Sequence, residues 1–469
     1  MGKKIVINPI TRISGFLEIE VEVEKNIIVN SSCSGMLFRG FEDMLKDRSP
    51  LDAIYFTERI CGICSTAHAY ASALALEDTL KVTPSFNDRL LREFIHGCEY
   101  LQNHIRHFYQ YTLPEYVKGP DFSPLLTMDY YDYRLPDKLN KELAKHYIQS
   151  TKYSKSAHEM LAILGGKAPH NHGIFVGGVT VNIDSEKFIR IKSLLSSIKD
   201  FSKNIMLEDV YIISKYYSDY FKNGKGYGNF MSYGAFENYP YEDISYLKPK
   251  VFINGEFFNF DKSYISENIY NAWYTSDKLD INPTDENTKE NINKKGAYSW
   301  IKAPRYYGYP MEVGPLARMW LSGEYTKGIS TMDRTIARVL EVIKITEILE
   351  GILKKIELIN TKQSKYEIPI KAKGNGLTDT TRGALGHWIS IEDKKISNYT
   401  IITPTTWNLS PTDSKGLKGP VEKALIGTYI KDLKNPIEIG RIVRSFDPCV
   451  SCATHVISDK YKPIKIRLL

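Results

Sequence analysis

The sequence predicts an α+β protein that is predominantly helical. Five long stretches repeat their apolar residues with the period of a helix, whereas alternating strand patterns are short and lie mainly near the two ends of the chain. The 469 residues contain no internal repeat and no low-complexity linker. We therefore expect one domain over residues 1–455, although a chain of this length could also form two or three.

Near the amino terminus, residues 5–7 and 16–29 are predicted to be strands. From Leu17 to Val23 apolar residues alternate with Glu18, Glu20 and Glu22. A period of two with charges on one side indicates a strand with one solvated face. The glutamates are interpreted as that face.

Helices are predicted next over residues 57–80, 87–111, 139–164 and 186–217. Ser85 suits the N-cap of the second helix, which must end before Pro114. Gly165 and Gly166 close the third helix, since glycine favours a helix C-terminus.

The middle of the chain, residues 219–300, is rich in Tyr, Asn, Gly and Asp and has no helical period. We expect an irregular segment with short strands there. A strong amphipathic helix follows over residues 331–358, with Thr331 or Asp333 near its cap. Residues 386–402 are predicted to form a hairpin that turns at Asp393 and Lys394, and residues 437–445 a short helix.

Composition excludes several classes of function. The net charge of +7 comes from scattered lysines, and no helix has a basic stripe with interleaved aromatics, so no nucleic-acid partner is expected. No segment has 18 consecutive apolar residues, and the start of the chain becomes polar at Asn8. We expect neither a membrane span nor a signal peptide in this chain.

Four of the six cysteines form two C-x-x-C pairs, Cys61 with Cys64 and Cys449 with Cys452, one near each end of the chain. Such a pair can direct two thiolates at one metal from a single turn of backbone. A four-thiolate zinc site, a redox pair and a site for another soft metal are all compatible with this pattern. The separation of the pairs is unlike a zinc ribbon, and the βαβ setting of a redox pair is missing.

The residues around both pairs resemble the two signature motifs of nickel–iron hydrogenase large subunits. The first is Arg59-Ile60-Cys61-Gly62-Ile63-Cys64 with His68, and the second is Asp447-Pro448-Cys449 to Cys452 with His455. Further resembling segments occur in the family's order at residues 38–42, 165–170, 303–306, 311–318, 382–388 and 404–408. Residues 219–295 match poorly, in a region where the family varies. The resemblance implies the family's fold, a central helix bundle with short β-sheets at its periphery.

The resemblance also implies a ligand set. Cys61 and Cys449 would be terminal nickel ligands, and Cys64 and Cys452 would bridge nickel to an iron that carries carbon monoxide and cyanide. The implied activity is the reversible heterolytic oxidation of dihydrogen to protons and electrons. That reaction needs a Lewis acid and a nearby base, and a thiolate such as Cys449 is preferred as the base, because arginine normally stays protonated.

Other residues acquire expected roles in the same way. Arg382 would lie above the open side of the metals, oriented by Asp447, and Thr405 would donate a hydrogen bond to a cyanide. His68 would tune a bridging sulfur. Glu42, the Ile401 carbonyl and His455 would hold a magnesium ion.

Two departures from the family pattern affect proton exit and the canopy over the metals. Ser14 replaces the family's usual glutamate, the first proton relay, and Thr381 replaces a proline before Arg382. Ser14 could hold a water, and Glu18 is a weak substitute relay. A further carboxylate, Glu115, stands where many relatives have Asp.

Electrons must leave through a partner, since an iron–sulfur cluster usually takes four thiolates and only Cys33 and Cys98 remain. We expect an obligate small subunit that carries the clusters. The final acceptor could be a cytochrome or quinone at a membrane, a ferredoxin, a nicotinamide or a deazaflavin. An export signal on the small subunit would place the pair at a membrane, in the periplasm or on the cell surface; otherwise it would be cytoplasmic.

Residues 456–469 are interpreted as a C-terminal extension. In the family such a tail is removed after the histidine once nickel is inserted, which implies a maturation endopeptidase and nickel-insertion proteins as further partners. An ordinary basic strand is the alternative.

Two other functions compete with hydrogenase: a metal-free scaffold subunit of a related respiratory complex, and a structural zinc protein. Retention of all four paired cysteines argues against the scaffold.

Overall fold

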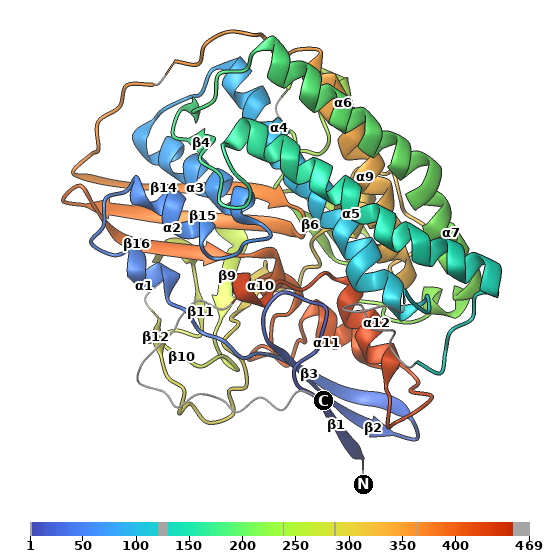
Figure 1. Cartoon of the computed structure of the whole chain (residues 1–469). Coiled ribbons are helices and arrows are strands. Elements are labelled where there is room, and N and C mark those ends of the chain that lie inside the picture. Colours follow the sequence, from blue (N-terminus) through green and yellow to red (C-terminus); the bar gives the residue numbers. More distant parts are fainter. Residues whose placement is uncertain (1, 121–129, 238, 286–287, 363, 454–469) are drawn as a thin grey trace.

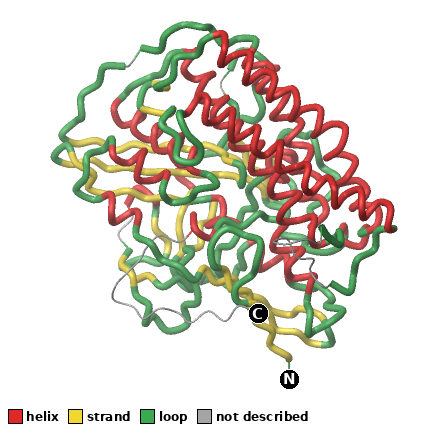
Figure 2. Tube along the Cα trace, in the orientation of Figure 1, coloured by secondary structure: helices red, strands yellow, loops and turns green. Residues whose placement is uncertain are grey.

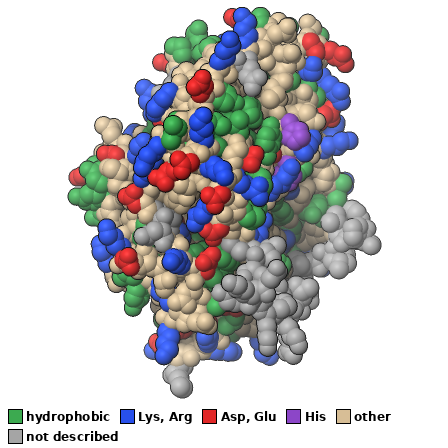
Figure 3. Space-filling view, turned by 90° about the vertical axis from the view of Figure 1, so that its left-hand side faces the viewer, with side chains coloured by type: hydrophobic (Ala, Val, Ile, Leu, Met, Phe, Trp, Pro, Cys, Tyr) green, Lys and Arg blue, Asp and Glu red, His purple; other side chains and the backbone are tan. Residues whose placement is uncertain are grey.

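The computed structural model describes residues 2–120, 130–237, 239–285, 288–362 and 364–453 (Figure 1). Long helices gather on one side of the molecule, and the sheets lie beside and below them (Figure 2). On the face drawn in Figure 3, basic and acidic side chains are interspersed. None of the described helices combines the length and apolar character needed to cross a membrane.

The amino-terminal sheet is an antiparallel meander of β1 (Lys3–Ile7), β2 (Leu17–Glu24) and β3 (Ile27–Gly35). The apolar residues of β2 are buried and its glutamates are not, as the alternation predicts. The prediction of one strand over 16–29 was wrong. The chain reverses at Lys25 and Asn26, both with left-handed φ, because a tight hairpin needs that conformation at its turn.

The helical side is built around α4 (Phe86–Arg106), which packs against α5 (Asp137–Gly165) and α9 (Thr331–Leu353). The Ser85 side chain caps α4 as predicted. The helix continues through a π turn (His107–Thr112) and a 3-10 turn (Leu113–Glu115).

The predicted helix 186–217 is α6 (Ser185–Phe201) and α7 (Leu207–Tyr216), joined by a π turn. The predicted helix 331–358 ends early, at Leu353, and its N-cap is Ser330, which forms a capping box with Asp333.

A second sheet packs against α3 (Ser65–Leu80) and consists of β14 (Lys371–Thr380), β15 (Gly383–Glu392) and β16 (Lys395–Ile402). The hairpin turns at Asp393 and Lys394, as predicted. Gly376 permits the close approach, since an added Cβ would lie 2.0 Å from the Ala71 carbonyl oxygen. The predicted start of the helix 57–80 was wrong: α2 (Asp52–Glu58) ends first, and the cysteine pair occupies the loop before α3.

The remaining elements are short. Residues 219–300 contain brief strands and 3-10 turns, in agreement with the predicted irregular segment. The other strands are β4 (Ile174–Phe175), β5 (Gly178–Val179), β6 (Phe230–Ser232), β7 (Lys250–Ile253), β8 (Glu256–Asn259), β9 (Ile265–Asn268), β10 (Tyr274–Thr275), β11 (Asp280–Ile281), β12 (Lys289–Glu290) and β13 (Ala303–Tyr306). The other helices are α1 (Phe41–Leu45), α8 (Pro315–Leu321), α10 (Pro404–Asn408), α11 (Pro420–Leu425), α12 (Ile437–Ser445) and α13 (Val450–Ala453).

Segments from the amino-terminal and carboxy-terminal parts of the described chain meet in space. The amino-terminal strand β3 packs against α11, and the Ile28 amide donates to the Thr428 carbonyl at 3.0 Å. The helix α12, predicted over 437–445, packs against α9 and leads the chain back toward α3. This closure brings the second cysteine pair to the first.

Candidate metal centre

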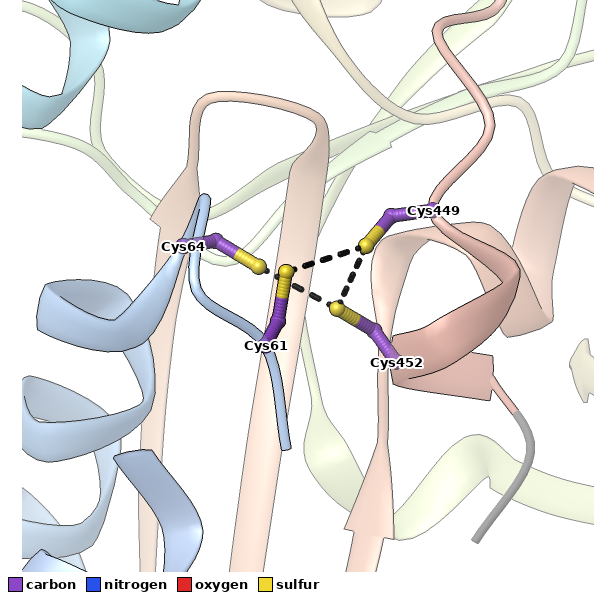
Figure 4. A group of neighbouring side chains, drawn as sticks. All are labelled: Cys61, Cys64, Cys449 and Cys452. Carbon is purple, nitrogen blue, oxygen red and sulfur yellow. Dashed lines mark hydrogen bonds between the residues drawn. The ribbon is translucent and has the colours of Figure 1, made fainter. Parts of the chain in front are cut away.

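Four sulfur atoms converge at the point where the chain ends meet (Figure 4). The Sγ atoms of Cys61, Cys64, Cys449 and Cys452 all lie within 4.8 Å of one another, and all four residues are buried. The Sγ atoms of Cys61 and Cys449 are 3.4 Å apart, and those of Cys64 and Cys452 are 3.1 Å apart. The two pairs therefore face each other across one site.

Each pair is presented by a turn of backbone. Cys61 and Cys64 flank the loop between α2 and α3, where the Ile63 amide donates to the Cys61 sulfur at 3.3 Å. Cys449 precedes α13, and the Cys452 amide donates to its carbonyl at 3.0 Å. The Cys449 amide donates in turn to the Thr405 hydroxyl at 3.0 Å. Thr405 thus fixes the orientation of the second turn.

The amino-terminal segment holds the second turn from the other side. Ser14 pairs with Cys449 in a parallel bridge: the Ser14 amide donates to the Pro448 carbonyl at 3.3 Å, and the Val450 amide donates to the Ser14 carbonyl at 2.7 Å. These bonds use only backbone atoms of Ser14. Gly15 lies so close that an added Cβ would be 2.6 Å from the Ser451 nitrogen.

A Gly15→Ala variant is therefore expected to displace the second cysteine turn. The φ angle of Gly15 is +92°, so alanine adds backbone strain to the steric clash, at a cost of about 1–3 kcal/mol. Thermal unfolding and bound metal per chain should both fall. A Ser14→Ala variant is the matched control, since it leaves the backbone bridge intact; equal metal content in the two variants would contradict this account.

Arg382 covers the site from the end of β14. Its Nη2 lies 3.0 Å from the Asp447 carboxylate, and its Nε donates to the Asp447 carbonyl at 2.9 Å. Both residues of this ion pair are buried, and the nearby carboxylate of Asp379 pairs with Arg318 instead. Asp447 therefore holds the Arg382 guanidinium through its carboxylate and its backbone carbonyl.

Arg382 and Asp447 each stabilise the charged form of the other. Burial alone would lower the pKa of Arg382, but the charges of Asp447 and the cysteines raise it well above its ordinary value. Burial also opposes ionisation of Asp447, yet Arg382 and, more weakly, His107 keep the pKa of that carboxyl well below its usual range. Both groups are therefore charged at neutral pH.

The cysteines favour a bound cation. Hydrogen bonds from the neighbouring thiols, with that of Cys449 foremost, lower the pKa of Cys61 well below its usual range, whereas burial raises the pKa of Cys452. A metal ion would stabilise all four thiolates together. Metal–sulfur bonds of about 2.3 Å allow one ion to bridge sulfurs up to about 4.6 Å apart, which suits the observed cluster. The donor set fits soft or borderline metals such as nickel.

A small cavity lies beside the sulfurs. It is lined by Cys64, Cys449 and Cys452 together with side chains from α3, from the β14–β15 hairpin and from α10, among them His68, Arg382 and Thr405. Arg382 Nη1 is buried and has no hydrogen-bond partner in the described part of the chain. Structural zinc sites are closed, whereas catalytic sites keep a position open. The cavity and the unpartnered donor indicate a site with an open side.

His68 faces its own partner inside the fold. Its Nδ1 lies 3.1 Å from Nε2 of His387, which leaves Nε2 of His68 as its other polar atom. Burial, opposed by Cys61 and assisted by the Arg39 charge, lowers the pKa of His68 to about 4. The imidazole is therefore neutral and can donate only one hydrogen bond.

The structure places the other predicted site residues farther out. The Ile401 amide donates to the Glu42 carboxylate at 2.8 Å, so these two lie together, while His455 is outside the described residues. Glu115 is buried among Arg12 and Arg444, and Glu18 accepts a hydrogen bond from Asn8. Neither carboxylate lines the cavity as far as the described residues define it.

Sequence reasoning missed several groups that support the site. Asn103, in α4, accepts from Arg382 Nη2 at 2.9 Å and donates to Asp447 at 2.8 Å. Arg318 donates to the carbonyls of Thr380 and Thr381, just before Arg382, and pairs with Glu341 at 2.6 Å. Of these groups, only Arg318 lies in a segment that had been noted in the sequence, because residues 311–318 resemble a family motif.

Comparison with known proteins agrees with this geometry. The family described as nickel-dependent hydrogenase matches residues 39–123 and 124–455. The periplasmic [NiFeSe] hydrogenase large subunit of Desulfomicrobium baculatum is 37% identical, over 97% of this chain and 95% of its own length. The hydrogenase-1 large chain of Escherichia coli is 30% identical, over 98% of this chain and 96% of its own length. A solved structure of the Ni-Fe-Se hydrogenase from D. vulgaris Hildenborough, in the reduced state, superposes with a TM-score of 0.92 at 36% identity and covers 97% of this chain and 100% of that one.

Proposed function

Since this chain belongs to the nickel-dependent hydrogenase family, we propose that its four clustered cysteines are the protein ligands of a nickel–iron centre. Cys61 and Cys449 would hold nickel, and Cys64 and Cys452 would hold both nickel and iron. The cavity that Arg382 covers is the observation that carries this assignment, because a structural four-thiolate site has no need of an open, lined space beside the sulfurs.

The chain is the large subunit of a hydrogenase, an oxidoreductase that acts on dihydrogen. Its electrons pass to a small subunit, which completes the heterodimer. Among the described cysteines outside the centre, Cys33 is on β3 and Cys98 on α4, and both are buried, so they cannot hold a cluster of the four-thiolate kind between them. The iron–sulfur clusters belong to the partner subunit.

The residues of the chain divide the chemistry of the reaction between them. When bound, the centre supplies a Lewis acid and takes up the two electrons of dihydrogen. Heterolytic cleavage also releases a proton, which the Cys449 thiolate accepts. Arg382 keeps its own protons, because the surrounding negative charges raise its pKa, and it therefore contributes a fixed positive charge and directed N–H donors over the cavity.

Further ligands complete the proposal. The iron would carry carbon monoxide and cyanide, and the Thr405 hydroxyl, which accepts from the Cys449 amide, would donate its own hydrogen to a cyanide. Glu42, the Ile401 carbonyl and His455 hold a magnesium ion. The hydrogen bond between Glu42 and the Ile401 amide supports the first two of these by placing them together.

The carboxy-terminal extension gives a prediction about maturation. Residues 456–469, outside the described part of the chain, are expected to be absent from active enzyme, removed by an endopeptidase after nickel-insertion proteins have loaded the site. Intact-mass measurement of the active large subunit should give a chain that ends at His455. Full activity in a subunit that still ends at Leu469 would contradict processing.

Two measurements on the purified two-subunit complex test the function. One is elemental analysis, and the other is consumption of dihydrogen with an artificial dye as the electron acceptor. About one nickel per chain and uptake of dihydrogen are expected, since four cysteines make one nickel-type site here. Zinc in place of nickel would identify a structural site, and the absence of metal would identify a scaffold subunit. The natural electron acceptor, at a membrane or in solution, is reached through the small subunit.

A further inference from the structure

Arg39 lies between the two cysteine turns and contacts both. Its Nη2 donates to the carbonyl of Ile60, the residue before Cys61, and at 2.5 Å to the carbonyl of Ser451, the residue before Cys452. We propose that Arg39 is a positioning residue for the metal centre: its guanidinium joins the two turns and sets how far apart the cysteine pairs stand. This inference rests on the proposed function.

The two turns need such a connection because the chain brings them together from far apart. Cys61 and Cys449 are 388 residues apart, and Cys64 and Cys452 are equally distant in sequence. Among the described residues, the direct side-chain contacts between the two turns are the sulfur–sulfur approaches. The Arg39 guanidinium instead donates to one backbone carbonyl of each turn, so it can hold the pairs in place before a metal binds.

The guanidinium is itself held in a fixed place. Its Cζ lies 4.9 Å from the centre of the Phe41 ring, in cation–π contact, and its Nε is buried without a hydrogen-bond partner among the described residues. The contact with Phe41 restrains the side chain in the orientation in which Nη2 reaches the two carbonyls. A planar fork loses less conformational freedom per hydrogen bond than a lysine would.

The charge of Arg39 also acts on the site. It contributes to the lowered pKa of His68, which lines the metal cavity. Arg382 places a second guanidinium over the same cysteines. Two fixed positive charges partly offset the repulsion between thiolates that must converge before metal arrives. Arg39 therefore supports the site through geometry and through charge, and touches neither substrate nor metal.

The test compares Arg39→Met with Arg39→Lys in the full two-subunit complex. Nickel per chain in Arg39→Met should fall about 10-fold or more, in the range for groups that orient metal ligands. Arg39→Lys retains a positive donor and should recover most of the nickel, with altered g-values in the nickel electron paramagnetic resonance spectrum. Arg48→Met is the matched control, since Arg48 stacks on Phe56 and donates to the Met44 carbonyl without reaching either turn.

An Arg39→Met complex with wild-type nickel content and an unchanged spectrum would overturn the positioning role. If that variant fails to fold, the Arg39→Lys spectrum decides: shifted g-values support the role, and a spectrum identical to wild type contradicts it. The proposed function fails separately, because a wild-type complex without nickel would refute it before any variant is compared.

Discussion

A Cys449→Ser variant is expected to lose nickel and hydrogen oxidation together, each by more than about 100-fold, because even groups that only orient metal ligands are worth about 10–100-fold. A serine hydroxyl is a harder, more weakly acidic donor than a thiol and suits nickel poorly. The substitution also removes the thiolate that accepts the proton. Nickel content and hydrogen uptake of the purified complex measure the two losses independently.

Cys98→Ser is the matched control for this substitution. Cys98 is as fully buried as Cys449, but it lies in α4 among apolar side chains and outside the sulfur cluster. Its replacement should reduce thermal stability while nickel per folded chain stays unchanged. Retention of wild-type nickel and turnover by Cys449→Ser would remove Cys449 from the ligand set.

An Arg382→Lys variant is expected to keep its nickel but to lose about 10²–10³-fold in turnover, the usual effect of removing one preorganised donor from an active site. Lysine conserves the charge beside Asp447, so the buried carboxylate is not left unpaired. It cannot reproduce the fork that contacts Asp447 and Asn103 and leaves Nη1 as a further, unpartnered donor among the described residues. The loss should appear in turnover per nickel.

Arg334→Lys provides the comparison, since Arg334 forms a buried ion pair with Glu312 away from the cavity. That variant should be destabilised without a change in turnover per nickel. Equal turnover in Arg382→Lys and wild type would show that Arg382 has a structural role alone.

The sequence correctly predicted helix ends and turns that are determined by residues close to them in the chain. The Ser85 cap, the glycines after α5 and the turn at Asp393 and Lys394 each depend on neighbours a few residues away. The errors arose where tertiary contacts override the pattern. Helical periodicity continued across the first cysteine pair, yet the loop there opens because both cysteines must point at the opposite turn.

In the candidate site, too, local sequence patterns identified some residues, whereas others depend on tertiary contacts. Spacing alone left zinc, redox and nickel interpretations open, and only the resemblance of the flanking residues distinguished them. The structure then brought the two pairs together and buried Arg382 against Asp447. Asn103 and Arg39 could not be assigned from sequence, since their partners lie 344 and 412 residues farther along the chain.

Ser14 shows why a motif cannot be interpreted one residue at a time. From the sequence, its side chain was considered only as a group that could hold a water where the family has a glutamate. In the fold its backbone bridges Cys449, and the neighbouring glycine permits that contact. The segment therefore matters for the shape of the second cysteine turn whatever side chain position 14 carries.

Nickel X-ray absorption of the purified complex tests most directly whether the chain ends meet in a single bimetallic site. The account predicts a first shell of sulfur at about 2.3 Å, as for other first-row ions bound by thiolates, and a second metal close beyond it. The sulfur shell should be depleted in complexes that carry Cys64→Ser. A nickel shell of nitrogen and oxygen, unaffected by substitution of the cysteines, would contradict the account.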